Sequence, residues 1–375
     1  MKVLVLGAGL VGGPMAADLK KDFDVSVADI SENALASLAS KGIAVIRQDL
    51  GDPAVVGKLV ADFDMVLNAV PGFMGYRTLE AIIRAGKNVV DIAFFPEDPF
   101  PLDDLARDNG VTGVMDCGVA PGMSNILTGY AQHLLDDIET AVTYVGGLPI
   151  LREWPYEYKA VFSPVDVIEE YTRPARYIEN GQWVTRPALT DAELISFPGV
   201  GTLEAFNSDG MRSLGYTIRA KNVKEKTLRY PGHIGIMAVL RETGFFSKEP
   251  IEIQGVRIAP LDFTSRLLFP KWKLQPGEED LTVMQVIAEG TKEGKKVRYT
   301  WDLLDRYDAE TGTHSMARTT GYTATVALRM IAEGKYGRPG LSVPEYIGEY
   351  PDCVRYLLEG LKQRGVIYHE TMSFI

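Results

Sequence analysis

The first nineteen residues constrain the fold of this chain more than any other segment. The apolar run Lys2–Leu6 predicts a buried strand, and a helical pattern follows it. Between strand and helix, Gly7, Gly9 and Gly12 have the spacing G-x-G-x-x-G. In this spacing the first glycine permits a tight turn, the second lets backbone approach a pyrophosphate, and the third lets the helix pack against the strand. Backbone N–H groups at the start of the helix would then face the phosphates.

An acidic residue at the end of the next predicted strand indicates which kind of ligand the glycine turn binds. Asp29 closes the strand in DVSVADIS, twenty residues after Gly9. An acid at that distance accepts hydrogen bonds from the adenosine ribose hydroxyls. The three residues after it are Ile, Ser and Glu, so no cationic side chain follows that could meet a 2′-phosphate. Turn and acid together predict a dinucleotide-binding domain with NAD, rather than NADP, as its cofactor.

Strand and helix patterns alternate through the rest of the first third. This alternation predicts a Rossmann-type, doubly wound parallel sheet, in which ligands bind beyond the carboxyl ends of the strands. Further strands are predicted at 43–47, 65–69, 88–92 and 111–115, and helices at 53–63, 75–85 and 102–109. Strand-end positions and the glycine turn give the predicted cofactor-binding residues, which are Gly7, Gly9, Leu10, Val11, Gly12, Asp29, Asp49, Asn68, Ala69, Val70 and Pro71.

The alternation stops after about residue 120, which predicts a second domain. An Asn-Gly pair at 180–181 favours a tight hairpin, and several long strand-like runs follow one another without intervening helices. We therefore predict an α+β domain with a largely antiparallel sheet over 121–311, and a first domain, 1–120, that is completed by 312–375. The predicted elements of the second domain are strands at 140–149, 158–164 and 226–233, a hairpin at 175–185, a helix at 234–246 and an antiparallel pair at 281–290 and 295–305.

Composition narrows the possible partners. The chain has 375 residues, with 39 Lys and Arg against 50 Asp and Glu, and its net charge of −11 argues against nucleic-acid or anionic-membrane binding. No apolar run approaches the roughly 18 residues of a membrane span. The two cysteines, Cys117 and Cys353, offer neither a disulfide framework nor a zinc-type spacing. With a strand starting at the first residues and no room for a signal peptide, we expect a cytoplasmic protein without a metal site.

Short motifs spread in order over nearly the whole chain carry a family resemblance. They are GVAPGMSN, YVGGLP, YKAVFSP, RPARYIENG, TLRYPGH and ARTTG, together with the N-terminal glycine turn. In these motifs the chain resembles the saccharopine dehydrogenase-like family of NAD(P)-dependent amino-acid oxidoreductases. The resemblance implies a Rossmann domain completed by C-terminal helices, a middle domain that supplies substrate contacts and a dimer interface, and hence a homodimer that acts on a small amino-acid substrate.

Within this family the chain looks most like the lysine 6-dehydrogenase subgroup, in VGGLP, EEYTRPAR and SDGMRS. Saccharopine reductases carry Asp and Cys where this chain has Ala120 and Val145. The implied reaction is NAD-dependent oxidative deamination of the lysine ε-amine to 2-aminoadipate 6-semialdehyde, which cyclises, with release of ammonia. Saccharopine reduction and carboxyspermidine-type reductive amination remain alternatives, as does a non-catalytic NAD-binding redox sensor.

The resemblance also suggests catalytic residues. Lys159, near a nicotinamide cation, would have a lowered pKa and could act as a base, although a surface lysine is an equal alternative. Asp116, after the last strand of the first domain, could accept the ε-ammonium or relay its proton, or could simply cap the next helix. Cys117 has no base beside it, and we predict that it is a small structural filler.

Substrate contacts are predicted in the second domain. Arg173 or Arg229 could hold the substrate carboxylate in a bidentate clamp, or be structural arginines paired with the acidic excess. His233 follows a Pro-Gly turn and is a candidate polar contact, although lone histidines are more often structural. Tyr158, next to Lys159 in the YKAVFSP motif, completes the predicted substrate-binding set.

Overall fold

The computed structural model describes residues 1–275 and 277–375, which form two compact units. Met1–Leu134 and Met316–Tyr368 make the first unit, and Leu135–Ser315 and His369–Ile375 make the second. The units therefore change at 134 and 316, whereas the domains were predicted to change at 120 and 312. The difference arises because helix α6 (Met123–Leu134) packs closely on the C-terminal segment of the first unit. A Cβ added to Gly129 of α6 would lie 2.2 Å from the Glu345 carbonyl oxygen.

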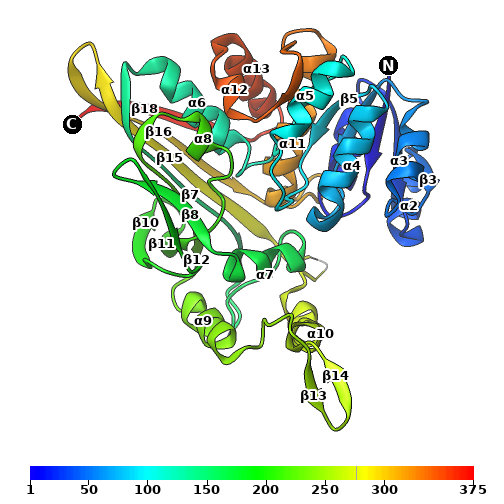
Figure 1. The fold of residues 1–375 in the computed structure, drawn as a ribbon, viewed down its shortest axis with the longest axis horizontal. Helices are drawn as coiled ribbons and strands as arrows, with labels where there is room; N and C mark the ends of the chain where they lie inside the picture. Colours follow the sequence, from blue (N-terminus) through cyan, green and yellow to red (C-terminus); the bar gives the residue numbers. More distant parts are fainter. Residues whose placement is uncertain (276) are drawn as a thin grey trace. The chain divides into compact units, whose positions relative to one another are not determined.

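The first unit is built on a seven-stranded parallel sheet with the strand order β17-β6-β5-β4-β1-β2-β3 (Figure 1). The central strands are buried along nearly their whole length, as expected for a sheet covered by helices. The predicted Rossmann-type sheet is thereby confirmed. Its strands are β1 (Lys2–Leu6), β2 (Asp24–Asp29), β3 (Ala44–Arg47), β4 (Met65–Asn68), β5 (Asn88–Asp91), β6 (Thr112–Val114) and β17 (Gly340–Ser342).

Local signals explain where the helices of this unit begin. Ser31 accepts the Ala34 N–H as the N-cap of α2, and Asp52 accepts the Ala54 N–H ahead of Pro53, the first residue of α3. The apolar faces of α3, α4 and α5 pack on the sheet in one core. The helices are α1 (Gly12–Leu19), α2 (Glu32–Ser40), α3 (Pro53–Val60), α4 (Gly72–Arg84), α5 (Pro101–Asp108), α6, α11 (Ser315–Ala332), α12 (Glu345–Gly348) and α13 (Pro351–Lys362).

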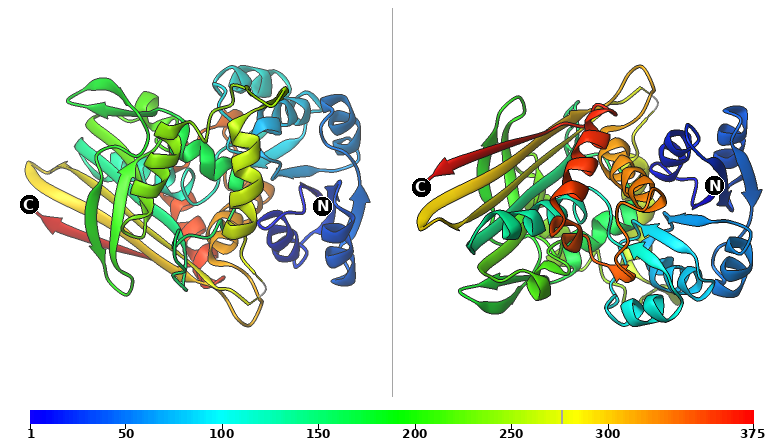
Figure 2. Two further views of the ribbon diagram at one scale, coloured as in Figure 1. Left: turned by 90° about the horizontal axis from the view of Figure 1, so that it is seen from below. Right: turned by 90° about the horizontal axis from the view of Figure 1, so that it is seen from above.

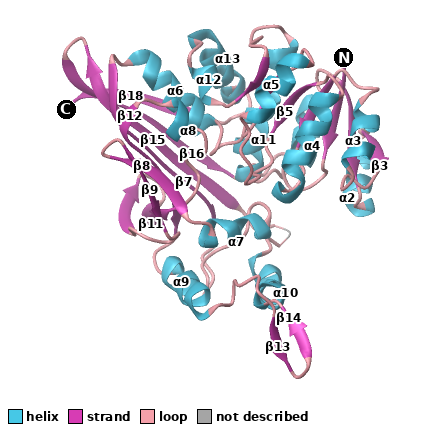
Figure 3. Ribbon diagram, in the orientation of Figure 1, coloured by secondary structure: helices cyan, strands magenta, loops and turns pink. Residues whose placement is uncertain are grey.

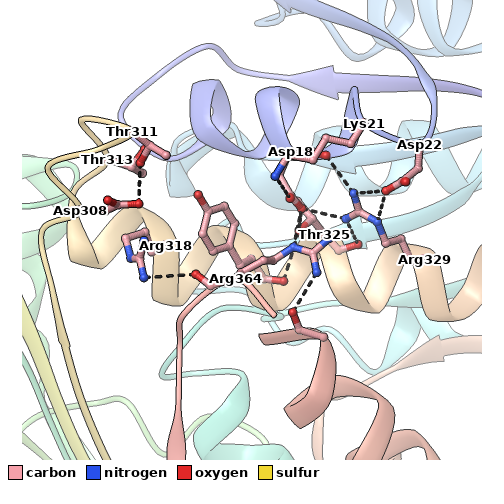
Figure 4. Close-up of polar contacts among 12 residues, drawn as sticks. Asp18, Lys21, Asp22, Asp308, Thr311, Thr313, Arg318, Thr325, Arg329 and Arg364 are labelled. Carbon is pink, nitrogen blue, oxygen red and sulfur yellow. Dashed lines mark hydrogen bonds and ion pairs between the residues drawn. The ribbon is translucent and has the colours of Figure 1, made fainter. Parts of the chain in front are cut away.

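A buried ion network fastens α1 to the C-terminal helices (Figure 4). Asp18, at the end of α1, is 3% exposed. Its carboxylate accepts hydrogen bonds from Thr325 Oγ1 at 2.6 Å, Arg329 Nη1 at 2.8 Å and Arg364 Nε at 2.9 Å. Arg329 also pairs with Asp22 at 2.6 Å. The network therefore holds the C-terminal helices α11 and α13 on the helix that follows the glycine turn.

The second unit contains a nine-stranded sheet, most of it antiparallel as predicted (Figures 2 and 3). Antiparallel registers join β10 to β11, β11 to β12, β7 to β15 and β15 to β16, whereas β7 and β12 are parallel. The strands are β7 (Asp137–Pro149), β8 (Ala175–Glu179), β9 (Gln182–Arg186), β10 (Glu193–Phe197), β11 (Gly201–Asn207), β12 (Ala220–Arg229), β15 (Asp280–Lys292), β16 (Lys295–Arg306) and β18 (Tyr368–Phe374).

The predicted hairpin at 175–185 is confirmed. Glu179 pairs with Gln182, and Asn180 and Gly181 have positive φ angles of 51° and 76°, as a type I′ turn requires. A second hairpin, β13 (Ile251–Ile253) and β14 (Val256–Ile258), was not predicted.

The strand predicted at 158–164 is wrong. Ala160 makes a single bridge to Lys273, and Pro164 already begins helix α7 (Pro164–Thr172). The aromatic side chain of Tyr158 packs instead into a core between helices. That core lies among α7, α9 (His233–Thr243) and α10 (Pro260–Trp272); the short helix α8 spans Leu214–Thr217.

Of the helices in the described ranges, none has an apolar stretch long enough to cross a bilayer.

Candidate functional site

The glycine turn after β1 has the geometry that a bound pyrophosphate needs. Gly7 has a φ of +101°, and a Cβ there would lie 2.6 Å from the Ala69 carbonyl oxygen. A Cβ on Gly12 would lie 2.1 Å from the Gly7 carbonyl oxygen, whereas a Cβ on Gly9 would meet nothing within 4 Å. Gly7 and Gly12 are therefore required by close backbone packing, and Gly9 faces open space where a ligand can approach.

Asp29 closes the other side of this turn. Its carboxylate accepts the Ala8 N–H at 2.6 Å and the Ser31 N–H at 2.7 Å, which places it beside the glycine turn. Leu10 and Ile30 flank it as apolar side chains that are 54% and 59% exposed. Val11 is the N-cap residue of α1, whose first N–H groups have no partner within the helix. An open glycine, a helix N-terminus and a carboxylate fit the pyrophosphate and ribose of a nicotinamide dinucleotide.

The structure brings to Asp29 one cation that the sequence analysis missed. Arg47, the last residue of β3, pairs in register with Asp29 of β2. Its guanidinium forms an ion pair with Glu32 at 2.5 Å. The sequence shows no cation in the three residues after Asp29, and only the pairing of β2 with β3 reveals Arg47. This arginine therefore bears on the choice between NAD and NADP.

The Asn68–Pro71 run begins at the last residue of β4 and so lies at the carboxyl end of this strand, as predicted. Because β4 is the neighbour of β1, Ala69 contacts the glycine turn directly. Asn68 is fully buried and donates from Nδ2 to Asp91, while its Oδ1 has no hydrogen-bond partner among the described residues. Val70 is buried, and Pro71 is the N-cap of α4. An unsatisfied buried acceptor at this strand end is consistent with a polar group of the cofactor binding here.

Asp49 follows β3, which lies at the edge of the sheet and pairs with β2. Its Oδ1 accepts the Gly51 N–H at 2.9 Å and so stabilises the loop that precedes α3. This carboxylate is exposed, and its one described hydrogen bond is local. The structure gives Asp49 a turn-forming contact, and its role in cofactor binding stays a prediction.

Asp116 and Cys117 follow β6 as buried residues. Asp116 has a positive φ of 49° and is 2% exposed. It lies well before Met123, the first residue of α6, and the first N–H groups of that helix bond to the Gly118 and Val119 carbonyls. The predicted proton-accepting role of Asp116 and its alternative as a helix cap both stay predictions.

The Cys117 thiol is fully buried, and its backbone N–H donates to the Asp91 carbonyl at 2.8 Å. Burial raises the pKa of this thiol, and the negative charges of Asp91 and Asp116 raise it further. A thiolate is thus disfavoured at neutral pH, and the structure agrees with the predicted filler role of Cys117.

In the second unit, Arg229 is enclosed by its own partners. Its side chain is 2% exposed. Nη2 pairs with Glu170 at 2.6 Å, Nε donates to the Tyr171 hydroxyl at 3.0 Å, and Nη1 donates to the Leu228 carbonyl at 2.9 Å. A substrate carboxylate would have to displace Glu170 to reach this guanidinium. Arg229 is thus engaged by the protein's own groups, and its role as a carboxylate clamp stays a prediction.

His233 belongs to the same hydrogen-bonded chain, and its tautomer follows from the partners. The Tyr156 carbonyl can only accept, so His233 Nδ1 donates to it at 2.8 Å. Nε2 must then accept from the Tyr171 hydroxyl at 2.9 Å. Burial and the nearby Arg229 charge lower the pKa of His233 to about 3. The imidazole is therefore neutral and has both nitrogens occupied, as a structural histidine does.

Tyr158 lies against this chain. Arg229 is 4.6 Å from the centre of its ring, and the ring also packs edge-on against Trp272. The Tyr158 hydroxyl is buried without a hydrogen-bond partner in the described residues, and burial raises its pKa well above the usual value. Tyr158 thus presents a neutral hydroxyl close to the Arg229 guanidinium.

Lys159 differs from the prediction. Its ammonium pairs with Glu153 at 3.0 Å and with Glu278 at 3.1 Å. Burial opposes the charge, but the two glutamates outweigh it and raise the pKa of Lys159 above its ordinary value. The predicted lowering of this pKa is wrong for this structure, because both glutamates stabilise the ammonium. Glu153 is near in the sequence, but Glu278 lies far along the chain and could not be inferred from the motif. The two ion pairs favour the protonated form of Lys159.

Arg173, at the end of α7, is the more accessible of the two candidate arginines. Its side chain is 17% exposed, and its described ion pair with Glu169 is long, at 3.7 Å. Among the described residues, no three His, Cys, Asp or Glu side chains come together as a metal site would need.

Comparison with known proteins covers nearly the whole chain. Residues 118–366 match the model of the saccharopine dehydrogenase C-terminal domain, and residues 3–114 match that of the saccharopine dehydrogenase NADP binding domain. The chain is 24% identical to carboxyaminopropylagmatine dehydrogenase from Synechocystis sp., over 99% of this chain and 98% of the relative. It is also 24% identical to carboxynorspermidine synthase from Vibrio cholerae, over 94% and 93%.

A solved structure has the same fold. Apo saccharopine dehydrogenase (L-Glu forming) from Saccharomyces cerevisiae superposes with a TM-score of 0.80 at 21% identity, over 99% of both chains.

Proposed function

The chain belongs to the saccharopine dehydrogenase family, and we propose that it is an NAD-dependent member that oxidatively deaminates the ε-amine of L-lysine. Membership makes it an NAD(P)-dependent oxidoreductase that acts on an amine substrate. The choice of lysine and of NAD goes further and is our inference. The proposed products are 2-aminoadipate 6-semialdehyde, ammonia and NADH, with water consumed.

The pairing of the candidate cations is the observation that carries this choice. Lys159 is held between two glutamates, and Arg229 is buried against Glu170. Saccharopine has three carboxylates and needs several cations to balance them. A substrate with two amines and one carboxylate suits a surface whose cations are already neutralised, because an unpaired buried charge costs several kcal/mol. Ala120 and Val145 support the same choice. Both are apolar, whereas saccharopine reductases carry Asp and Cys at these two positions.

The roles proposed for individual residues follow from these contacts. The bound nicotinamide would supply the hydride acceptor, held by the glycine turn and Asp29. We propose that Asp116 accepts the proton of the ε-ammonium, since Asp116 is a buried carboxylate at a strand end. Arg173 is the proposed partner of the α-carboxylate. Lys159 stays protonated, paired with Glu153 and Glu278, instead of acting as a base.

The substrate assignment is tested by measuring NADH and ammonia together. We expect NADH and equal ammonia from L-lysine, and little or no NADH from saccharopine at the same concentration. Asp116→Asn should lower kcat with lysine by about 10²-fold or more, because general-base catalysis contributes at least that much. Cys117→Ala is the matched neighbouring control and should keep most of the activity. Saccharopine turnover that releases glutamate, with lysine inert, would contradict the assignment.

The rate should rise with pH if a neutral amine is oxidised. The lysine side chain has a pKa of about 10.4, so at pH 7 only about one molecule in 2,500 presents the neutral amine. At subsaturating lysine, kcat/KM should therefore climb from pH 7 towards roughly pH 9–10. A profile that is flat over this range would count against amine oxidation as the reaction.

A second candidate is reductive coupling of an amine to an aldehyde. It is favoured by the relatives named carboxyaminopropylagmatine dehydrogenase and carboxynorspermidine synthase, which match over almost their full length. The glutamates around Lys159 would equally suit a polyamine. NADH or NADPH consumption with a diamine and an amino-acid semialdehyde, without lysine oxidation, would favour this reaction. Tight NAD binding without turnover of any amine would favour a redox sensor.

A further inference from the structure

Three charged side chains lie at the adenosine end of the predicted cofactor site. The parallel register of β2 and β3 pairs Asp29 with Arg47, and the Gln48 N–H donates to the Asp29 carbonyl at 3.0 Å. Neighbouring strands lie roughly 4.8 Å apart, so the backbone of Arg47 lies one strand spacing from the backbone of Asp29, whose carboxylate is assigned to the ribose. The third side chain is Glu32, in the first turn of α2.

The Arg47 guanidinium is paired with Glu32. The two side chains form an ion pair at 2.5 Å, and they are 68% and 66% exposed. A ligand at this surface can therefore reach both of them. Guanidinium groups bind phosphates in a bidentate manner, so an unpaired Arg47 would suit a 2′-phosphate. With Glu32 in place, the three groups carry one net negative charge, and a second carboxylate faces any incoming phosphate.

We propose that Glu32 withholds Arg47 from the 2′-phosphate of NADP, and that this ion pair, together with Asp29, makes the chain select NAD. Loss of Glu32 alone then turns Arg47 into a phosphate ligand. The inference rests on the NAD preference within the proposed function, but not on the identity of the amine substrate.

The test is direct binding of NADH and NADPH, followed by nicotinamide fluorescence, in four proteins. Wild type should bind NADH more tightly than NADPH. Glu32→Gln should tighten NADPH binding about tenfold, or about 1.4 kcal/mol, and leave NADH binding nearly unchanged, since it removes a negative charge close to a doubly charged phosphate. The double variant Glu32→Gln/Arg47→Gln should lose that gain. Glu80→Gln removes a comparable exposed ion pair, with Arg84 at 2.7 Å on α4, and should change neither affinity.

Each alternative outcome overturns the proposal. If wild type binds NADPH as tightly as NADH, Glu32 withholds nothing. If Glu32→Gln leaves NADPH affinity unchanged, Arg47 does not reach the phosphate. If the gain persists in the double variant, simple relief of repulsion explains it without Arg47. These readouts need no amine, so a failed lysine assay and a failed binding test remain distinguishable.

Discussion

Asp18→Asn should destabilise the first unit by about 3 kcal/mol, at the lower end of the cost of removing one partner from a buried charge network. The variant leaves the Arg329 and Arg364 guanidinium groups facing an uncharged amide. Both arginines are largely buried, at 8% and 13% side-chain exposure, so water cannot replace the lost carboxylate. The unfolding midpoint in urea, followed by a probe in the first unit, measures the effect.

Asp22→Asn is the matched control for this prediction. Asp22 also pairs with Arg329, but its side chain is 51% exposed. An exposed pair contributes about 1 kcal/mol or less. We therefore expect a much smaller shift of the midpoint from Asp22→Asn than from Asp18→Asn. Equal shifts would mean that burial of the Asp18 carboxylate does not determine its contribution.

The effect of Asp18→Asn should also depend on pH. Burial opposes the charge of Asp18, but the hydrogen bonds from Thr325 and Arg364 and the charge of Arg329 outweigh it and lower the pKa of the carboxyl. A carboxyl with a lowered folded-state pKa contributes stability above its unfolded pKa of about 3.9 and loses it as the pH falls through the folded pKa. The difference between wild type and variant should be constant near neutral pH and shrink below about pH 4.

Gly12→Ala should reduce the affinity for NADH by at least about 100-fold, because the residues that bind the pyrophosphate cannot keep their positions. The new Cβ would lie 2.1 Å from the Gly7 carbonyl oxygen, which belongs to the backbone of the turn itself. Backbone atoms cannot move aside as a flexible side chain can, so α1 must shift away from β1. Binding of NADH, followed by its fluorescence, measures the loss.

Substitutions at two further glycines distinguish a local effect on NADH binding from misfolding of the unit. Gly9→Ala meets nothing within 4 Å, so the variant should fold normally and lose affinity only because its methyl group occupies space needed by the ligand. Gly57→Ala, in the middle of α3, also meets nothing within 4 Å and should leave NADH binding unchanged. Unimpaired NADH binding by Gly12→Ala would show that the turn does not bind the dinucleotide.

Features set by local chemistry were predictable from the sequence. The glycine turn and Asp29 lie within one strand-turn-helix-strand segment, so their spacing in the sequence is enough to predict that they are in contact. The Asn180-Gly181 turn was likewise predictable, since only residues that accept positive φ angles suit it.

Features set by pairing between distant segments were not predictable. Strand β17 has three residues, too few for a periodic pattern, and it exists because β6 pairs with it. The pairing of Lys159 with Glu278 and the place of Arg47 beside Asp29 depend on the same kind of contact. The mistaken strand at 158–164 shows the converse, since its residues have the right composition but Tyr158 packs among helices.

The order in which the chain is synthesised determines when the Asp18 network can form. The partners of this carboxylate, Thr325, Arg329 and Arg364, follow it by 307, 311 and 346 residues. A ribosome releases the N-terminus first, so α1 emerges long before any of them. Throughout most of translation the end of α1 therefore carries a negative charge without these partners. The first helix to be synthesised is among the last to be completed.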